Sequence, residues 1–172
     1  DVTDCAVVPA LFQDIVHDLG GLDLIAYVAG AQPAVAPNEY NFEKDAAMIQ
    51  VNLLGAIAWL NQAAIRFERA RHGHIVGVSS IAGDRGRVGA PVYNTSKAGL
   101  NTYLEALRNR LARRGVTVTT IKPGFVDTRL LANAAKTFWV ISPEEAADQI
   151  YLAILRKRST VYVPRRWGLV GL

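Results

Sequence analysis

Hydrophobic and polar positions along the chain predict strands and helices in regular alternation. Short apolar runs rich in β-branched residues indicate buried strands, and apolar residues spaced three and four positions apart indicate amphipathic helices. Leu100, Leu104, Leu107 and Leu111 show the helical spacing clearly. The expected strands cover residues 22–29, 74–78, 116–121 and 160–163, and the expected helices cover residues 9–19, 42–70, 93–114 and 143–156.

Glycines, prolines and one capping sequence mark where these elements end and begin. Gly20-Gly21 ends the first helix, Gly115 ends the third, and Pro123-Gly124 breaks the strand before it. Ser142-Pro143-Glu144-Glu145 is a capping box with proline at the first helical position. The boundaries therefore support the same alternation as the hydrophobic pattern.

Alternating strands and helices imply an α/β fold, a doubly wound parallel sheet with helices on both faces. The 172 residues form a single domain of about four strands. In such sheets ligands bind beyond the carboxyl ends of the strands. Those ends carry Ala29-Gly30, Ser79-Ser80 and Pro123-Gly124, so we expect these three segments to meet in one crevice.

Composition and charge are those of an ordinary globular protein, with 51% hydrophobic residues, 20% charged residues and a net charge of +4. The longest apolar stretch, around residues 51–60, contains Asn52 and is too short to span a membrane. No leader sequence is visible, and the lone Cys5 suits a reducing compartment, so we expect a cytoplasmic protein. We expect no nucleic-acid partner and, from His72-Gly73-His74 without acidic neighbours, no metal.

Tyr93 and Lys97 are the most informative pair in the chain. Residues four apart are neighbours on a helix, so the ammonium of Lys97 is expected to lie near the phenol of Tyr93. A nearby positive charge lowers the pKa of a phenol, and general acid–base catalysis needs such tuning. The alternative is a buried tyrosine followed by a solvated lysine, because a pair this simple also arises by chance.

Several further spacings resemble the short-chain dehydrogenase/reductase family. Tyr93-x-x-x-Lys97 is similar to the family's catalytic pair, and Ser80, thirteen residues earlier, falls where its catalytic serine lies. Asn52 lies twenty-eight residues before Ser80, at the place of the family's asparagine. The segment Pro123-Gly124-x-Val126-x-Thr128 resembles the nicotinamide-contacting motif, and Asp1-Val2 resembles the pair that lines the adenine pocket.

The resemblance implies a Rossmann-like fold and an oxidoreductase that interconverts a hydroxyl and a carbonyl group on a small molecule, using NAD or NADP. Tyr93 would be the acid or base, Lys97 would lower its pKa and hold the ribose, and Ser80 would bind the substrate oxygen. Asn52 would bend its helix and hold a water. The implied cofactor contacts are Asp1, Val2, Ala29, Gly30, Tyr93, Lys97, Pro123, Gly124, Val126 and Thr128. The resemblance also implies a homodimer or homotetramer.

Two departures from the family leave alternatives open. Tyr27-Val28-Ala29-Gly30 stands where the family has two asparagines before Ala-Gly, so side-chain amides that brace the sheet are absent. No glycine-rich turn joins a strand to a helix, so we expect an N-terminally truncated fold with an exposed sheet edge. A binding or scaffold protein without turnover, or a related lyase or epimerase, would fit the same residues.

Overall fold

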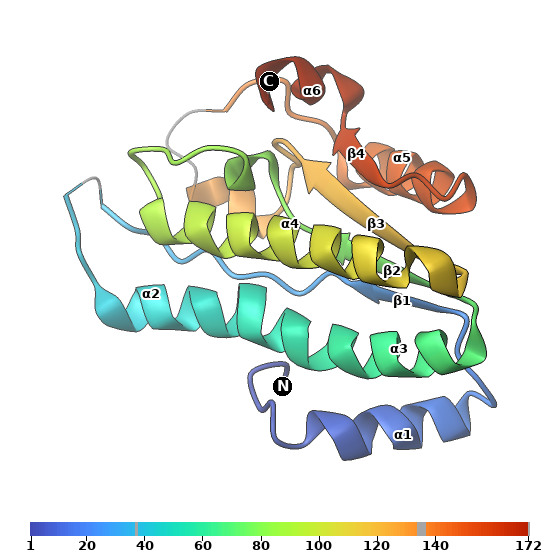
Figure 1. The fold of residues 1–172 in the computed structure, drawn as a ribbon. Coiled ribbons are helices and arrows are strands. Elements are labelled where there is room, and N and C mark those ends of the chain that lie inside the picture. Colours follow the sequence, from blue (N-terminus) through green and yellow to red (C-terminus); the bar gives the residue numbers. More distant parts are fainter. Residues whose placement is uncertain (37, 134–136, 172) are drawn as a thin grey trace.

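Helices and parallel strands alternate through the computed structural model, which describes residues 1–36, 38–133 and 137–171 (Figure 1). This confirms the α/β, Rossmann-like fold class. The strands are β1 (Leu24–Tyr27), β2 (Gly73–Val78), β3 (Val116–Pro123) and β4 (Thr160–Val163). The helices are α1 (Val8–Asp18), α2 (Phe42–Ile49), α3 (Ala56–Ala70), α4 (Pro91–Leu111), α5 (Pro143–Leu155) and α6 (Gly168–Gly171), and short helical turns include η1 (Gln50–Gly55) and η2 (Ile81–Gly83).

The four strands pair in the order β1-β2-β3-β4, all parallel. Alternate residues of a strand face opposite sides of a sheet. Ile75 of β2 therefore packs in the core that α1, α3 and α4 form on one face, whereas its neighbour Val76 packs with α5 on the other. Figure 1 shows α1, α3 and α4 side by side, with α5 beyond β4. The predicted cover of helices on both faces is confirmed.

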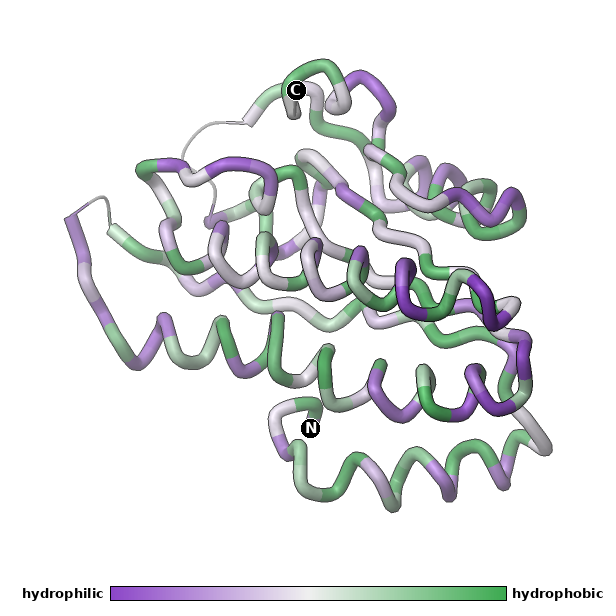
Figure 2. Tube along the Cα trace, viewed as in Figure 1, coloured by the Kyte–Doolittle hydropathy of each residue, from purple (hydrophilic) through white to green (hydrophobic). Residues whose placement is uncertain are grey.

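The helical faces follow the hydrophobic pattern of the sequence. Leu100, Leu104, Leu107 and Leu111 of α4 are all buried, as their spacing predicts. Figure 2 shows hydrophobic and hydrophilic residues interspersed along α1 and α3. The Ser142 hydroxyl accepts a hydrogen bond from the Glu145 N–H at 3.1 Å, which confirms the predicted cap of α5.

Strand β1 is shorter than the predicted 22–29. It pairs with β2 only from Leu24 to Tyr27, because the chain then leaves the sheet towards Asn52, whose side chain binds the backbone of Ala31. As expected for a sheet edge, apolar side chains in and just after β1 are uncovered: Leu24 is 37% exposed, and Val28, the residue after the strand, is 66% exposed.

The predicted helix over residues 42–70 is interrupted by the π-helix η1. It contains Asn52, so the expected local distortion at this residue is confirmed. Among the described residues, the helical stretch Phe42–Ala70 is also the one candidate membrane span by length and composition, with a mean hydropathy of 1.3. Its apolar face is nevertheless used in the fold, because Leu60 and Phe67 are buried against the sheet.

Candidate active site

Helix α4 begins beside the carboxyl end of β2 and carries Tyr93 and Lys97 in its first two turns. Pro91 opens the helix, where its missing N–H costs no hydrogen bond. Lys97 is 4% exposed, and its Nζ lies 5.9 Å from the centre of the Tyr93 ring. The same Nζ donates a hydrogen bond to the Val78 carbonyl at 3.1 Å. Lys97 is therefore a buried cation, not a solvated one.

Ser80 follows the end of β2 and faces the phenol of Tyr93. The Ser80 side chain lies close enough to the Tyr93 phenol to lower its pKa. The Ser80 hydroxyl also caps η2 by accepting from the Ala82 N–H at 3.1 Å, and it points to the Pro123 carbonyl at 3.4 Å. The structure thus brings Ser80, Tyr93 and Lys97 together, as the sequence predicts.

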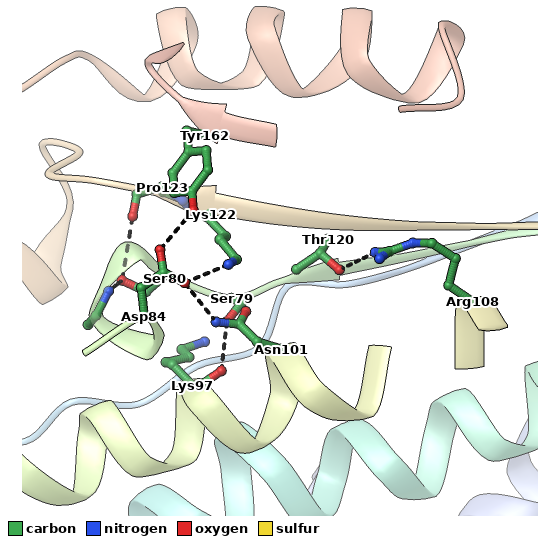
Figure 3. Close-up of polar contacts among 11 residues, drawn as sticks. Ser79, Ser80, Asp84, Lys97, Asn101, Arg108, Thr120, Lys122, Pro123 and Tyr162 are labelled. Carbon is green, nitrogen blue, oxygen red and sulfur yellow. Dashed lines mark hydrogen bonds and ion pairs between the residues drawn. The ribbon is translucent and has the colours of Figure 1, made fainter. Parts of the chain in front are cut away.

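The neighbouring Ser79 has a different partner. Its hydroxyl is buried and donates to the Lys97 carbonyl at 3.1 Å, which ties β2 to α4 (Figure 3). Since successive side chains leave a strand end in opposite directions, only one of the two serines reaches the phenol. The predicted preference for Ser80 agrees with this geometry.

The pKa of Tyr93 differs from the sequence prediction. Burial of the ring raises it above its usual value, and the hydrogen bond with Ser80 only partly offsets this rise. Burial also lowers the pKa of Lys97 to about 8. Desolvation, which favours the neutral form of both groups, outweighs the effect that was expected from the charge of Lys97.

Asn52 lies fully buried in η1 and holds the loop after β1. Its carbonyl oxygen accepts from the Ala31 N–H at 2.7 Å, and its amide donates to the Ala31 carbonyl at 2.9 Å. The amide also donates to the Ser96 hydroxyl at 3.1 Å, and Ser96 in turn donates to the Tyr93 carbonyl at 2.8 Å. Asn52 therefore links the β1 loop to the turn of α4 that carries Tyr93.

Gly30 lies beside Lys97 and Asn52, and Ala29 before it packs on the core. A Cβ on Gly30 would lie 3.6 Å from Lys97 Nζ and 3.7 Å from Asn52 Oδ1. The glycine therefore leaves space beside the buried ammonium, where a ligand hydroxyl could approach. Gly30, Asn52 and Lys97 thus lie together at this end of the sheet.

The segment after β3 is held by packing that the sequence did not reveal. Gly124 donates to the Val163 carbonyl at 2.8 Å, and a Cβ on it would come within 1.9 Å of Trp167 Nε1. Val126 forms a bridge with Ile141, and Thr128 is exposed. The glycine of this motif thus makes room for an indole ring, in addition to any role with a cofactor.

Phe138 and Trp139, in the segment between Thr128 and α5, combine exposure with aromatic packing. They are 50% and 43% exposed, and both rings lie against Trp167, with centroids at 4.9 and 5.2 Å. Trp139 has a positive φ of 54°, a conformation that is rare for a bulky side chain. Residues 134–136 of the same segment lie outside the described part of the chain.

Asp1 and Val2, expected at an adenine pocket, make contacts near the start of the chain and with the core. The Asp1 carboxylate accepts hydrogen bonds from the N–H and hydroxyl of Thr3, both at 2.9 Å. Val2 packs on the core, with its carbonyl beside Gly55. A role for either residue in an adenine pocket stays a prediction.

Two structural features were missed in the sequence. Tyr27, at the place of a family asparagine, donates its hydroxyl to the Val51 carbonyl at 2.5 Å and thereby braces β1 against η1. Asp84, in the loop after Ser80, is partly buried, with a side chain only 10% exposed, and is paired with Lys122 at 2.5 Å (Figure 3). A charged Lys122 at the end of a largely buried strand was a signal for such a partner.

The two histidines considered for a metal lie in different surroundings. His74 is buried and bonded through Nε2 to the Thr119 hydroxyl at 2.8 Å, whereas His72 is exposed and lies 3.8 Å from Asp23. Among residues 1–36, 38–133 and 137–171, no three His, Cys, Asp or Glu side chains cluster as metal ligands would.

Comparisons with known proteins agree with this geometry. An uncharacterized oxidoreductase of Myxococcus xanthus is 34% identical over 98% of this chain and 66% of its own length. One from Mycobacterium tuberculosis is 29% identical over 95% of this chain and 65% of its own length. This chain therefore spans about two thirds of the length of these relatives.

Solved structures share the fold at lower identity. ElxO with NADP bound has a TM-score of 0.82 at 21% identity, and the match covers 96% of this chain and 75% of that one. A short-chain type dehydrogenase/reductase from Mycobacterium ulcerans also has a TM-score of 0.82, at 19% identity, covering 95% of this chain and 66% of that one. The family model for short chain dehydrogenases matches residues 1–138. The chain belongs to the short-chain dehydrogenase family.

Proposed function

We propose that the full-length natural protein is an NAD- or NADP-dependent oxidoreductase that interconverts a hydroxyl and a carbonyl group on a small molecule. The observation that carries this proposal is the grouping of Ser80, Tyr93 and Lys97 at the carboxyl end of the sheet. Membership of the short-chain dehydrogenase family and the NADP bound to ElxO support it. A proton donor, a hydroxyl that binds oxygen and a buried cation are the groups that carbonyl reduction needs.

Tyr93 would exchange the proton with the substrate oxygen. Because burial raises the pKa of the phenol, Tyr93 is protonated at neutral pH, which is the form required to reduce a carbonyl. The Ser80 side chain influences the pKa of the phenol and is therefore its neighbour, so a substrate oxygen that receives a hydrogen bond from Ser80 would also lie near the Tyr93 proton. In the oxidation direction, the same phenol would have to lose its proton first, and the charge of Lys97 would favour that step.

Lys97 is suited to hold the ribose of the cofactor. An ammonium has three donors, and one of them is bonded to the Val78 carbonyl. Gly30 leaves open space next to Nζ for ligand hydroxyls. When bound, the nicotinamide would supply or accept the hydride at the substrate carbon.

These residues account for contacts with the nicotinamide end of the cofactor but not with its pyrophosphate. Pro123 and Gly124 lie beside Ser80 and complete the nicotinamide end of the proposed site. In contrast, the 172 residues contain no glycine-rich strand-to-helix turn that would bind a pyrophosphate through backbone N–H groups. The proposal therefore assigns the nicotinamide and ribose contacts to this chain, and no phosphate contact.

The assembly and location of the protein are further parts of this proposal. A homodimer or homotetramer through α3 and α4 would cover apolar side chains such as Ile65, which is 47% exposed. A cytoplasmic location would keep Cys5 reduced. Light scattering of the full-length protein at several concentrations tests the assembly, and a strictly monomeric mass at all of them would contradict it.

A titration of the full-length protein with NADH and with NADPH tests the function. We expect the fluorescence of at least one reduced cofactor to change on binding, and carbonyl compounds from a panel of ketones and aldehydes to oxidise it. A protein that binds neither cofactor contradicts the proposal and favours a scaffold role. A protein that binds a cofactor but converts its substrate without net oxidation of NADH or NADPH would be a lyase or epimerase.

A further inference from the structure

The carboxylate of Asp84 is bonded from three other elements of the fold. Its Oδ1 pairs with Lys122 Nζ of β3 at 2.5 Å, and its Oδ2 accepts from the Tyr162 hydroxyl of β4 at 3.0 Å. The Asn101 amide of α4 donates a longer bond to Oδ1 at 3.4 Å. Figure 3 shows these three side chains reaching Asp84 from different directions. The carboxylate thus joins β3, β4 and α4 to its own loop.

The ion pair between Asp84 and Lys122 is largely shielded from solvent, which restricts the movement of both side chains. The side chains of Asp84 and Lys122 are 10% and 14% exposed, and the ammonium of Lys122 also lies 5.3 Å from the centre of the Tyr162 ring. At such burial, removing one partner leaves an uncompensated charge and is strongly unfavourable. The η2 turn also packs directly on α4, because a Cβ on Gly83 would lie 2.6 Å from the Lys97 carbonyl carbon.

The same turn connects this ion pair to the proposed active site. Ser80 caps the start of η2 and Asp84 caps its end, so the two residues share one rigid turn. Lys122 is followed by Pro123, whose carbonyl receives the Ser80 hydroxyl. Asn101 lies one helical turn after Lys97. The Asp84 carboxylate is therefore connected to Ser80 through the η2 turn, to Pro123 through Lys122, and to Lys97 through Asn101.

We propose that Asp84, held by Lys122, is a positioning residue that fixes the Ser80 hydroxyl against Tyr93. This inference rests on the proposed oxidoreductase function and deepens it. Asp84 does not touch the reacting atoms in this account. It sets the position of the η2 turn relative to β3 and α4, and through it the direction in which Ser80 offers its proton. Oriented donors act on developing charge only where they are held in place.

A double-mutant cycle in the full-length protein tests this inference. We expect Asp84→Asn to lower kcat for carbonyl reduction about tenfold, with the cofactor KM unchanged, because Ser80 is no longer aligned. In a Ser80→Ala background the same change should cost less than twofold, since no hydroxyl remains to be aligned. Equal losses in the two backgrounds, or wild-type kcat in Asp84→Asn, would overturn the inference.

Two controls keep the result interpretable. Glu68→Gln removes a carboxylate from the Glu68–Arg114 pair, which joins the last turn of α3 to the turn after the carboxyl end of α4, and should leave kcat unchanged. If Asp84→Asn does not fold, Tyr162→Phe removes one bond to the carboxylate and keeps the ion pair. That variant should lower kcat two- to fivefold in the wild-type background only, and wild-type kinetics would overturn the inference. If the wild-type protein binds no cofactor, the proposed function itself fails; if it turns over and the cycle is additive, only this inference fails.

Discussion

The ammonium of Lys97 lies 5.9 Å from the centre of the Tyr93 ring. Burial nevertheless raises the pKa of Tyr93 and lowers the pKa of Lys97, so it favours the neutral form of both groups. The fold therefore holds a cation in a place where solvation does not favour its charge. Such a placement costs stability, and it is typical of a residue kept for binding or catalysis.

Replacing Lys97 by methionine should stabilise the fold. The pKa of Lys97 falls from 10.5 to about 8 on folding, so at pH 7 its charge costs about 3 kcal/mol. Loss of the bond to the Val78 carbonyl returns about 1 kcal/mol of this, which leaves a net gain of about 2 kcal/mol. Urea unfolding at pH 7 measures the gain.

The pH dependence of this effect has a definite sign. Between pH 8 and 10.5 the unfolded chain binds more protons at Lys97 than the folded chain, so wild-type stability rises relative to Lys97→Met across this window. Lys44→Met, which removes a half-exposed lysine, should give no gain at pH 7. A Lys97→Met protein that is less stable than wild type at pH 7 would contradict the account.

Acidification should destabilise the protein through His74. Its Nε2 donates to the Thr119 hydroxyl, because that hydroxyl donates to the Arg158 carbonyl at 2.6 Å. Burial, with a smaller contribution from Lys157, lowers the pKa of His74 below its usual 6.5. The unfolded chain therefore binds more protons as the pH falls through 6.5, and stability is lost there.

Thermal unfolding between pH 7.5 and 5 measures this loss. His74→Gln should unfold with a flatter pH dependence over that range, whereas His17→Gln, on the exposed side of α1, should keep the wild-type slope. The same slope in wild type and His74→Gln would show that His74 is not the group responsible.

Removing the Tyr27 hydroxyl should weaken the contact between β1 and η1. Tyr27→Phe leaves the Val51 carbonyl without its donor, and loss of such a bond costs about 1–2 kcal/mol. Tyr40→Phe is the matched control, since Tyr40 is 97% exposed. Both variants unfolding at the wild-type temperature would mean that Tyr27 does not brace the sheet.

A methyl group at Gly124 should disturb the aromatic cluster around Trp167. The added carbon would lie 1.9 Å from Trp167 Nε1, so the indole has to move, at a cost of about 1–3 kcal/mol. The near-ultraviolet circular dichroism of Gly124→Ala should change along with its unfolding temperature. Gly86→Ala, where nothing lies within 4 Å of an added Cβ, should change neither.

The sequence predicted the fold well because the hydrophobic period alone determines most of it. The leucines of α4 and the capping residue Ser142 took the positions that their spacing implied. The end of β1 was misplaced, since the residues after Tyr27 are as apolar as a strand, whereas in the structure the chain leaves the sheet there and Ala31 bonds to Asn52. Such a contact spans more than twenty residues and leaves no local signal.

The residues of the candidate site could be predicted from the sequence, but their pKa shifts could not. Spacing identified Ser80, Tyr93 and Lys97. The direction in which the pKa of Tyr93 shifts depends instead on how deeply the ring is buried, which only the packed structure shows. The same holds for Asp84, a loop residue by sequence that a lysine on a separate strand makes part of the interior.

The most direct test of the central claim is the turnover of Tyr93→Phe in the full-length protein. We expect carbonyl reduction to fall by about 10²–10⁴-fold, with binding of the reduced cofactor retained, because only the proton donor is lost. Tyr103→Phe is the control on the same helix, since its hydroxyl bonds to Asn61 at 2.8 Å, and should keep wild-type turnover. A Tyr93→Phe protein that reduces carbonyls at the wild-type rate would contradict the account.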